Sequence, residues 1–485
     1  MKSGLFLNMV ALYPVAELHY AQRHHFKKDS VAYRCDGELR YCHVNPFGRT
    51  AICRYCISRA DDVIDKIGLH VVRIASSNGD HVLSNAGIAA TENAVMSTLA
   101  SMLRVSDRTE LNKTWMKVYF NLLTSSKEIF GFFEREFAGN LELLYMFNGR
   151  FAWDGAARAA AILNGKNYFV YDFKKTGSYY EFHNVSLHST WENHRRALTF
   201  YLARPTKARE VAKELIESKI AGIPTYERSY TELQQKNCLT VDLCPSLRVI
   251  SIFPSSDDEY RFLGGEWEAP IIDSQVREIW DLAARIDNKQ FQIVVRMHPN
   301  MKGLSQRMIE SYRHVGKVFN NVFVLLPEDT TSTYTLIEKS DVIVCFCSTV
   351  AAEANYMRKL VVNIGGAPYY KLPVSNYVDS GAKAAELINS QKLKFKPQRA
   401  SIIWFYYLWR YSDENPHIRN PEQQMDEGKT PFRFSIRKPY ILRLLQAPLR
   451  AEIEVKRPAK KNSAYFARFV RSTIDILINK FSIKS

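Results

Sequence analysis

The chain of 485 residues contains no run of 18 apolar residues, so no segment reads as a transmembrane helix. Its N-terminal stretch, MKSGLFLNMVALYPVAELHY, has one lysine and a short apolar segment interrupted by Pro14, Glu17 and His19. A secretory signal peptide would show a clearer apolar core and a cleavage site of small residues. Internal repeats and low-complexity segments are absent as well. We therefore expect globular domains that stay in the cytoplasm.

Acidic residues are few relative to basic ones. The chain has 50 Asp and Glu against 66 Lys and Arg, a formal net charge of +16. Such an excess indicates an anionic partner, which is nucleic acid, an acidic membrane face or a phosphorylated substrate. Residues 431–485 hold 13 basic and 3 acidic residues, a surplus of 13 − 3 = 10. Because the surplus is terminal and does not line one face with interleaved aromatic residues, we expect no nucleic-acid partner.

The basic C-terminal segment has the pattern of an amphipathic helix. Apolar side chains recur at helical spacing within AYFARFVRSTIDILINKF, residues 464–481, and basic residues lie off this stripe. A basic amphipathic helix can lie on an anionic bilayer, which would make the protein peripheral on the inner membrane. The alternative is a helix that packs on the body of the protein with its basic face solvated.

A regular alternation of short apolar runs and helical patterns begins at residue 248. The predicted strands are RVISIF, FQIVVRM, VFVLLP, DVIVCF and KLVVNIG, at residues 248–253, 291–297, 322–327, 341–346 and 359–365. Helical patterns separate them. This alternation predicts a parallel sheet covered on both faces. Ligands of such sheets bind beyond the carboxyl ends of the strands.

The first half is similar in kind. Predicted strands include GLFLNMV, SVAYRC, LELLYMFN and NYFVYDF, with a helix at WDGAARAAAILNG and another at residues 14–26. The length exceeds what one core supports. We expect an N-terminal Rossmann-like domain over residues 1–240, a C-terminal one over 241–395, and a helical crossover with the basic tail over 396–485.

Two polar clusters follow neighbouring strands of the second half. Arg296, His298 and Pro299 come directly after one strand. An imidazole there can donate a hydrogen bond to a phosphoryl oxygen, and a guanidinium offers a charged fork. The alternative for the histidine is a cap on the next helix.

The second cluster stands where the strand DVIVCF meets a helix. Ser348 and Thr349 offer hydroxyls and backbone N–H groups to an anion, and Glu353 one turn later could hold a ribose hydroxyl. An ordinary helix cap is the alternative. Ser255 and Ser256, after the first strand of this half, are further candidates for phosphate binding or for starting a helix.

The order of these motifs resembles the C-terminal half of GT-B glycosyltransferases, most of all those of bacterial capsule and surface-polysaccharide synthesis. It runs from SSDDE through RMHPN and CSTVAAEA to RKLVVNIGG, over about residues 245–370. The His-Pro and Ser-Thr pairs are also similar to those of polysialyltransferases, Kdo transferases and CDP-glycerol glycerophosphotransferases. The resemblance implies two doubly wound domains facing a cleft. It also implies that His298, Ser348 and Thr349 bind the phosphates of a nucleotide-sugar, which in the first two comparisons is CMP-linked.

The catalytic base, if the reaction inverts configuration, would come from the N-terminal domain. Asp172 ends a predicted strand and is our first choice, followed by Asp154 and His188. Asn148 and Arg150, together with His188, are candidates for acceptor binding. The Arg-Gly that capsule proteins often carry after the second strand is absent here, which leaves the base open.

Four cysteines lie close together in the first domain. Cys35, Cys42, Cys53 and Cys56 form a C-x6-C-x10-C-x2-C pattern around a Pro- and Gly-containing hairpin. Four thiolates can close a tetrahedral structural zinc site. Free thiols and an iron–sulfur cluster are the alternatives, and catalysis itself needs no metal or other cofactor in this interpretation.

The sequence thus predicts a glycosyltransferase that moves a sugar from a nucleotide-sugar to a glycan or glycolipid acceptor. A nucleotide-sugar epimerase of the same fold and a glycerol-phosphate polymerase are the alternative enzymes. The epimerase would convert free nucleotide-sugar without an acceptor.

Overall fold

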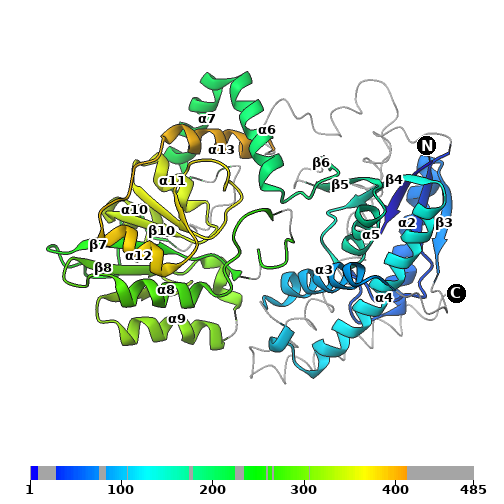
Figure 1. Ribbon diagram of the computed structural model, residues 1–485, viewed down its shortest axis with the longest axis horizontal. Coiled ribbons are helices and arrows are strands. Elements are labelled where there is room, and N and C mark those ends of the chain that lie inside the picture. The colour runs from blue at the N-terminus through cyan, green and yellow to red at the C-terminus, as the bar shows by residue number, and fades with distance from the viewer. Residues whose placement is uncertain are drawn as a thin grey trace. The chain divides into compact units, whose positions relative to one another are not determined.

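The computed structural model describes residues 2–8, 29–75, 83–105, 108–173, 179–223, 225, 234–257, 260–264, 267–304 and 306–411. The contacts between residues divide the chain at Leu187/His188 into an N-terminal and a C-terminal unit (Figure 1). The predicted helix at 14–26 and the predicted basic helix at 464–481 lie outside the described residues.

The N-terminal unit is built on a six-stranded sheet of order β3-β2-β1-β4-β5-β6. Its strands are β1 Lys2–Leu7, β2 Val31–Cys35, β3 His70–Ile74, β4 Leu141–Phe147, β5 Asn167–Phe173 and β6 Tyr179–His183. The first five are parallel, and β6 pairs antiparallel with β5. The order reverses between β1 and β4, which places a topological switch point at their carboxyl ends.

Helices cover both faces of this sheet because successive strand residues point to opposite sides. Leu5 and Leu7 pack in one cluster with α2, while Phe6 between them meets Phe133 of α4 at a ring distance of 5.1 Å. The helices of this unit are α2 Thr50–Ile67, α3 Asn85–Leu103, α4 Lys113–Ala138 and α5 Ala152–Leu163, with a short 3-10 turn η1 Arg108–Glu110.

The small residues of α5 let it approach its neighbours closely. A Cβ added at Gly155 would lie 2.5 Å from the Cβ of Ala94 in α3, and the buried alanines of α5 contact α3 and α4. This packing fixes the first turn of α5, which carries Asp154.

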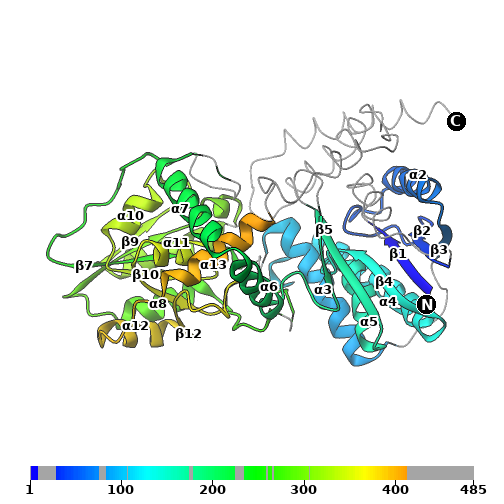
Figure 2. The same ribbon diagram turned by 90° about the horizontal axis from the view of Figure 1, so that it is seen from above.

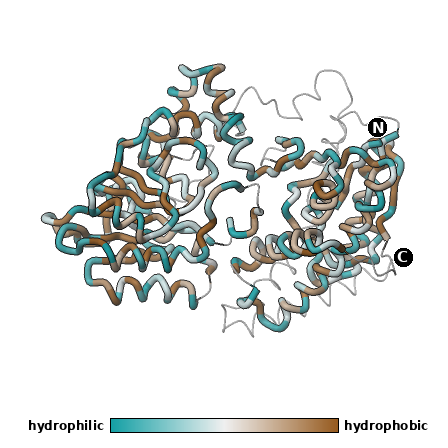
Figure 3. The backbone as a smooth tube through the Cα atoms, in the orientation of Figure 1, coloured by the Kyte–Doolittle hydropathy of each residue, from teal (hydrophilic) through white to brown (hydrophobic). Residues whose placement is uncertain are grey.

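The C-terminal unit contains a second six-stranded sheet, entirely parallel, of order β12-β11-β10-β7-β8-β9. Its strands are β7 Arg248–Phe253, β8 Phe291–Arg296, β9 Val322–Leu325, β10 Val342–Cys345, β11 Leu360–Ile364 and β12 Asn376–Val378. The order reverses between β7 and β10. In the inner strands β7, β8, β10 and β11 nearly all side chains are buried, as expected for strands covered on both faces, whereas the edge strands β9 and β12 are partly exposed. In Figure 3 the inner strands are among the most hydrophobic segments.

Two layers of helices enclose this sheet, as seen in Figure 1 and Figure 2. One layer comprises α8 Gln275–Arg285, α9 Gln306–Val318 and α12 Gly381–Asn389. The other comprises α7 Pro205–Ala221, α10 Thr333–Lys339, α11 Val350–Tyr356 and α13 Gln398–Arg410, and α6 Thr190–Ala203 packs on α13. A 3-10 turn, η4 Pro299–Gly303, follows β8.

The predicted pair of doubly wound domains is confirmed, but the units divide earlier than the expected boundary at 240/241. The reason is that α6 and α7 pack against α13 and belong to the C-terminal unit. The apolar cluster that joins them contains Leu215, Trp404 and Phe405. Amphipathic helices alone do not say which domain their apolar side meets, so the sequence left this open.

In the part of the chain that the structure describes, no helix combines the length and apolar composition that crossing a lipid bilayer requires.

Candidate active site

A pocket of about 620 Å³ opens in the C-terminal unit near the carboxyl ends of β7, β8 and β10, at the switch point of the sheet. Residues predicted to bind phosphate line it together, although 50 residues separate them along the chain: His298, Ser348 and Thr349. Pro254 and Pro299 contribute apolar walls. We call this hollow the phosphate pocket.

His298 is held in one tautomer by the turn that follows it. Its Nδ1 accepts a hydrogen bond from the backbone N–H of Asn300 at 3.0 Å, and the imidazole caps η4. The proton of the neutral ring therefore lies on Nε2, which makes that nitrogen the donor of the ring. The capping role and the phosphate-binding role are thus compatible, since each uses a different nitrogen.

The hydroxyls of Ser348 and Thr349 lie at the start of α11. Ser348 Oγ accepts from the N–H of Val350 at 3.3 Å, and the backbone oxygen of Ser348 accepts a short hydrogen bond from Tyr369. Thr349 occupies the N-cap position, but its side chain caps no backbone N–H. These hydrogen bonds hold the backbone and the side chain of Ser348 in place, and Ser348 and Thr349 both line the pocket.

A buried ion pair forms the rear of the phosphate pocket. Lys219 Nζ of α7 lies 2.8 Å from Glu353 Oε1 of α11, and both side chains are 4% exposed. Tyr334 donates its hydroxyl to Glu353 Oε2 at 2.9 Å. Both carboxylate oxygens of Glu353 thus have protein partners, and its contact with a ribose hydroxyl stays a prediction. Lys219, which also lines the pocket, had no signal in the sequence beyond one lysine in an amphipathic helix.

Arg296 lines the pocket but acts on the backbone. Its guanidinium donates to the carbonyl oxygens of Met297, Leu326 and Asp329, at 2.8 to 3.0 Å. Burial lowers its pKa, an effect that Asp329 and Glu328 oppose. Arg296 thus joins the ends of β8 and β9, and its contact with phosphate stays a prediction.

Ser255 and Ser256 are buried and do not line the phosphate pocket. Gln275 forms two hydrogen bonds with Ser255. Its Oε1 accepts from the backbone N–H of Ser255 at 3.0 Å, and its Nε2 donates to Ser255 Oγ at 3.3 Å. Ser255 thus joins the loop after β7 to the start of α8, and the phosphate contact of Ser255 and Ser256 stays a prediction.

A second polar cluster occupies the switch point of the N-terminal unit. Asn8 follows β1, Asn148 follows β4, and Asn148 Nδ2 donates to Asp172 Oδ2 of β5 at 2.7 Å. Asn148 adopts a left-handed backbone with φ of 56°, which turns its side chain toward β5. Asp172 is only partly buried, so a bound hydroxyl group can reach its carboxylate.

Asp154 lies beside this cluster with 1% of its surface exposed. Burial raises the pKa of its carboxyl well above the ordinary value, the Asn8 side chain opposes the shift, and the nearby Asp172 adds to it. No hydrogen bond of normal geometry reaches either carboxylate oxygen. The protonated form of Asp154 is therefore favoured.

His43 and Arg150 flank the same region. His43 stacks on Phe151 at 4.3 Å, and burial with the nearby Arg150 lowers its pKa to about 4, so the ring is neutral at pH 7. Arg150 Nη2 donates to Ser101 Oγ at 3.0 Å. His188 is the first residue of the C-terminal unit, and its predicted role in acceptor binding stays a prediction. The sequence analysis did not single out His43. The cysteines are the only distinctive residues near it in the sequence, and they give no reason to choose this histidine.

The four cysteines line one pocket of about 460 Å³, as their spacing suggested. Yet in the described residues no group of three or more His, Cys, Asp or Glu side chains is arranged to hold a metal ion, so the predicted zinc site is not found. Separate hydrogen bonds engage two of the sulfurs: Cys35 accepts from Gly37 N–H and Cys53 from Asn45 Nδ2. Burial raises the pKa of the thiols of Cys35, to about 11, and of Cys42 and Cys53.

Two doubly wound units, with ligand-sized pockets at the strand ends, define the class of Rossmann-like α/β proteins. Within it, residues 242–376 match the family of capsule polysaccharide biosynthesis proteins. This segment contains helix α11 and three residues of the phosphate pocket, His298, Ser348 and Thr349. The match confirms the predicted resemblance in this segment and supports the predicted glycosyltransferase class. No curated protein matches the chain at a significant level.

Three solved structures illustrate the more distant similarity. The beta Kdo 2,4 transferase KpsC of Thermosulfurimonas dismutans is 13% identical, with 55% of this chain and 80% of that chain covered and a TM-score of 0.35. UDP-GlcNAc 2-epimerase of Neisseria meningitidis, bound to UDP-GlcNAc, is 10% identical, with 84% and 100% covered and a TM-score of 0.25. MurG of Acinetobacter baumannii is 10% identical, with 88% and 98% covered and a TM-score of 0.26. Similarities this low carry no argument about substrate.

The buried ion pair should be a large stability determinant. Lys219→Met leaves Glu353 as an uncompensated buried charge, so the free energy of unfolding should fall by about 3–5 kcal/mol. The double variant Lys219→Met/Glu353→Gln should recover most of the loss. The matched control is Lys213→Met on the same helix, whose partner Glu217 lies 3.8 Å away and where both side chains are exposed; it should cost under about 1 kcal/mol. Equal losses in Lys213→Met and Lys219→Met, measured by urea unfolding, would contradict this account.

The raised pKa of Asp154 predicts a pH-dependent stability. Between the unfolded and the folded pKa, only the folded state keeps the proton, so stability falls as pH rises, by up to about 1.4 kcal/mol per pH unit for this one group. Asp154→Asn removes this loss. The free energy of unfolding of Asp154→Asn should therefore rise relative to that of the parent protein as the pH is raised from 4 upward. Parallel pH profiles of the two proteins in urea unfolding would show that Asp154 does not bind a proton on folding.

Proposed function

We propose that the chain is a glycosyltransferase of capsule-type polysaccharide synthesis that transfers a sugar from a nucleotide-sugar to a glycan or glycolipid acceptor. The observation that carries the proposal is the convergence of His298, Ser348 and Thr349 in one pocket. This pocket lies at the strand ends of a sheet whose sequence matches the capsule family. Basic residues 431–485 would bring the enzyme to an anionic membrane surface where a lipid-linked acceptor is presented.

The phosphate pocket would stabilise the leaving nucleotide. As the bond between the sugar C1 and the phosphate oxygen breaks, the electron pair stays on that oxygen and negative charge grows there. We expect the Nε2–H of His298 and the hydroxyl of Ser348 to donate to it, with Thr349 beside them in the lining. Lys219 also lines the pocket, and its charge is paired with Glu353. This stabilisation of the leaving nucleotide would require no metal ion.

Asp172 is the group best suited to take the proton from the acceptor hydroxyl while the new C1–O bond forms. It is partly exposed, it lies near the carboxyl end of β5, beside β4, and Asn148 donates to one of its oxygens. Asp154 is too deeply buried to meet a substrate and acts on Asp172 as a neighbour. Arg150 and Asn148 would bind the acceptor close to this carboxylate.

Thermal-shift measurements with CMP, CDP, UDP and GDP test the nucleotide site directly. One or more of these should raise the melting temperature of the parent protein, and His298→Ala should lose the shift and at least about 100-fold in transfer. His298→Gln, whose Nε2–H₂ lies near the position of the imidazole Nε2–H, should keep more of both. His314→Ala, a ring stacked on Trp280 at 5.6 Å in the same unit, is the control and should behave as the parent. If none of the four nucleotides stabilises the protein, the proposed donor is wrong.

The base is tested by Asp172→Asn. Transfer should fall by about 10²–10⁴-fold because proton removal is lost, while the nucleotide-induced thermal shift should stay, since that site belongs to the other unit. Normal transfer by Asp172→Asn in a sugar-transfer assay would exclude it as the base. Conversion of nucleotide-sugar without an acceptor would instead favour the epimerase alternative.

A further inference from the structure

The connection between α12 and α13 concentrates positive charge. Residues 391–399 read QKLKFKPQR, and no acidic residue occurs between Glu386 and Asp413. Residues 390–397 contain neither helix nor strand, and α13 begins directly after them. We call residues 391–399 the basic strap. Its four cations are Lys392, Lys394, Lys396 and Arg399.

Neighbouring acids do not neutralise the strap. All four cations are exposed or half-exposed. Among the residues that the structure describes, no ion pair engages any of the four. Exposed lysines elsewhere in the unit do have partners: Lys383 lies 2.6 Å from Asp379, and Lys207 lies 3.3 Å from Glu210. The charge of the strap is therefore available to an anionic partner.

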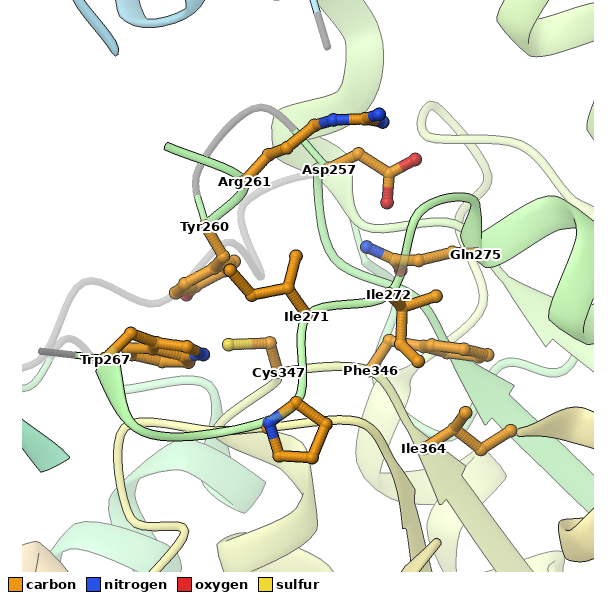
Figure 4. A pocket seen from close by; sticks show the side chains of 12 residues that line it. Asp257, Tyr260, Arg261, Trp267, Ile271, Ile272, Gln275, Phe346, Cys347 and Ile364 are labelled. Carbon is orange, nitrogen blue, oxygen red and sulfur yellow. The ribbon is translucent and has the colours of Figure 1, made fainter. Parts of the chain in front are cut away.

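An aromatic side chain stands in the middle of these cations. Phe395 is 66% exposed, whereas Leu393, two residues earlier, packs against the core beside α8 and α12. Another exposed apolar residue of the unit, Ile271, lines a hollow together with Tyr260 and Trp267 (Figure 4). Phe395 is instead surrounded in the sequence by lysines on both sides. An apolar ring among cations is the combination that binds the boundary between lipid head groups and acyl chains.

Hydrogen bonds from the body of the unit hold the strap in place. Asn376 Nδ2 donates to the carbonyl oxygen of Lys394 at 2.9 Å, and Asn355 Nδ2 donates to that of Lys396 at 3.1 Å. Asn376 begins β12 and also donates to the carbonyl oxygen of Val361 in β11. The strap therefore crosses the amino ends of β11 and β12. The phosphate pocket lies at the opposite, carboxyl edge of the same parallel sheet.

We propose that the basic strap is a docking surface for the anionic face of a lipid bilayer, with the ring of Phe395 inserted between the head groups. Lysine suits such a surface because its ammonium is a point charge on a flexible stem, whereas recognition of a single phosphate favours the arginine fork. Docking by this edge of the sheet leaves the phosphate pocket open to the aqueous side. This contact is separate from the basic tail at 431–485 and does not depend on the reaction that the protein catalyses.

Co-sedimentation of the full chain with vesicles tests the assignment. The vesicles consist of phosphatidylcholine alone, or of phosphatidylcholine and phosphatidylglycerol in equal parts, and the parent protein should bind the second kind. Lys392→Gln/Lys394→Gln/Lys396→Gln should bind these vesicles at least about tenfold more weakly, since one lysine near an anionic bilayer contributes about fivefold. Phe395→Ser should weaken binding by about tenfold because no ring enters the apolar region. Phe395→Trp should bind at least as tightly as the parent.

The matched control removes the same charge from exposed positions elsewhere in the unit. This control is Lys207→Gln/Lys289→Gln/Lys383→Gln, and it should bind the anionic vesicles within about twofold of the parent, because charges away from the bilayer are screened. All the variants change surface side chains, so each should keep the melting temperature of the parent protein.

Three results would overturn the assignment. The first is a parent protein that does not bind anionic vesicles, or strap variants that bind them as well as the parent does. The second is an equal loss in the control and in the lysine variant, which would show that net charge acts and not the strap. The third is a lysine variant that loses affinity for a fluorescent single-stranded RNA while Phe395→Ser leaves vesicle binding unchanged, which would make the strap a nucleic-acid site.

Discussion

The ion pair between Lys219 and Glu353 is the interaction on which the phosphate pocket depends. It joins α7 to α11 through two buried side chains, and the hydroxyls of Tyr334 and Thr349 also donate to the carboxylate. A buried pair of this kind is costly unless all its partners are in place, so it specifies the position of α11 rather than merely adding stability. Ser348 and Thr349, at the start of α11, are thereby set against His298 at the end of β8.

Other side chains around the pocket also support its loops. Arg296 donates to backbone carbonyl oxygens, and Gln275 forms hydrogen bonds with Ser255. Both residues thereby fix the loops at the strand ends. His298 fixes the turn through Nδ1 and also lines the pocket. Side chains that hold the loops thus lie beside the residues predicted to bind phosphate. Rigid support of this kind lets a few donors act on a phosphate without reorganising.

The N-terminal unit uses a comparable arrangement for different chemistry. Its switch point carries carboxyl and amide groups where the C-terminal unit carries hydroxyls and an imidazole. Asp154 and Asp172 have opposite surroundings, one sealed from water and one accessible and held by Asn148. The environment therefore distinguishes two otherwise equal carboxylates, and only the accessible one suits proton transfer with a substrate.

The sequence by itself determined the alternation of strands and helices, and with it the sheet edge at which His298, Ser348 and Thr349 meet. Strand and helix periodicities are local, and the carboxyl ends of parallel strands always share an edge. Only the tertiary structure decided that α6 and α7 join the C-terminal unit, that Glu353 and Arg296 have protein partners, and that the cysteines share a pocket without forming a metal-ligand set. Those outcomes depend on side chains far apart in sequence, such as residues 219 and 353, and no local pattern records which distant group a charge or thiol will meet.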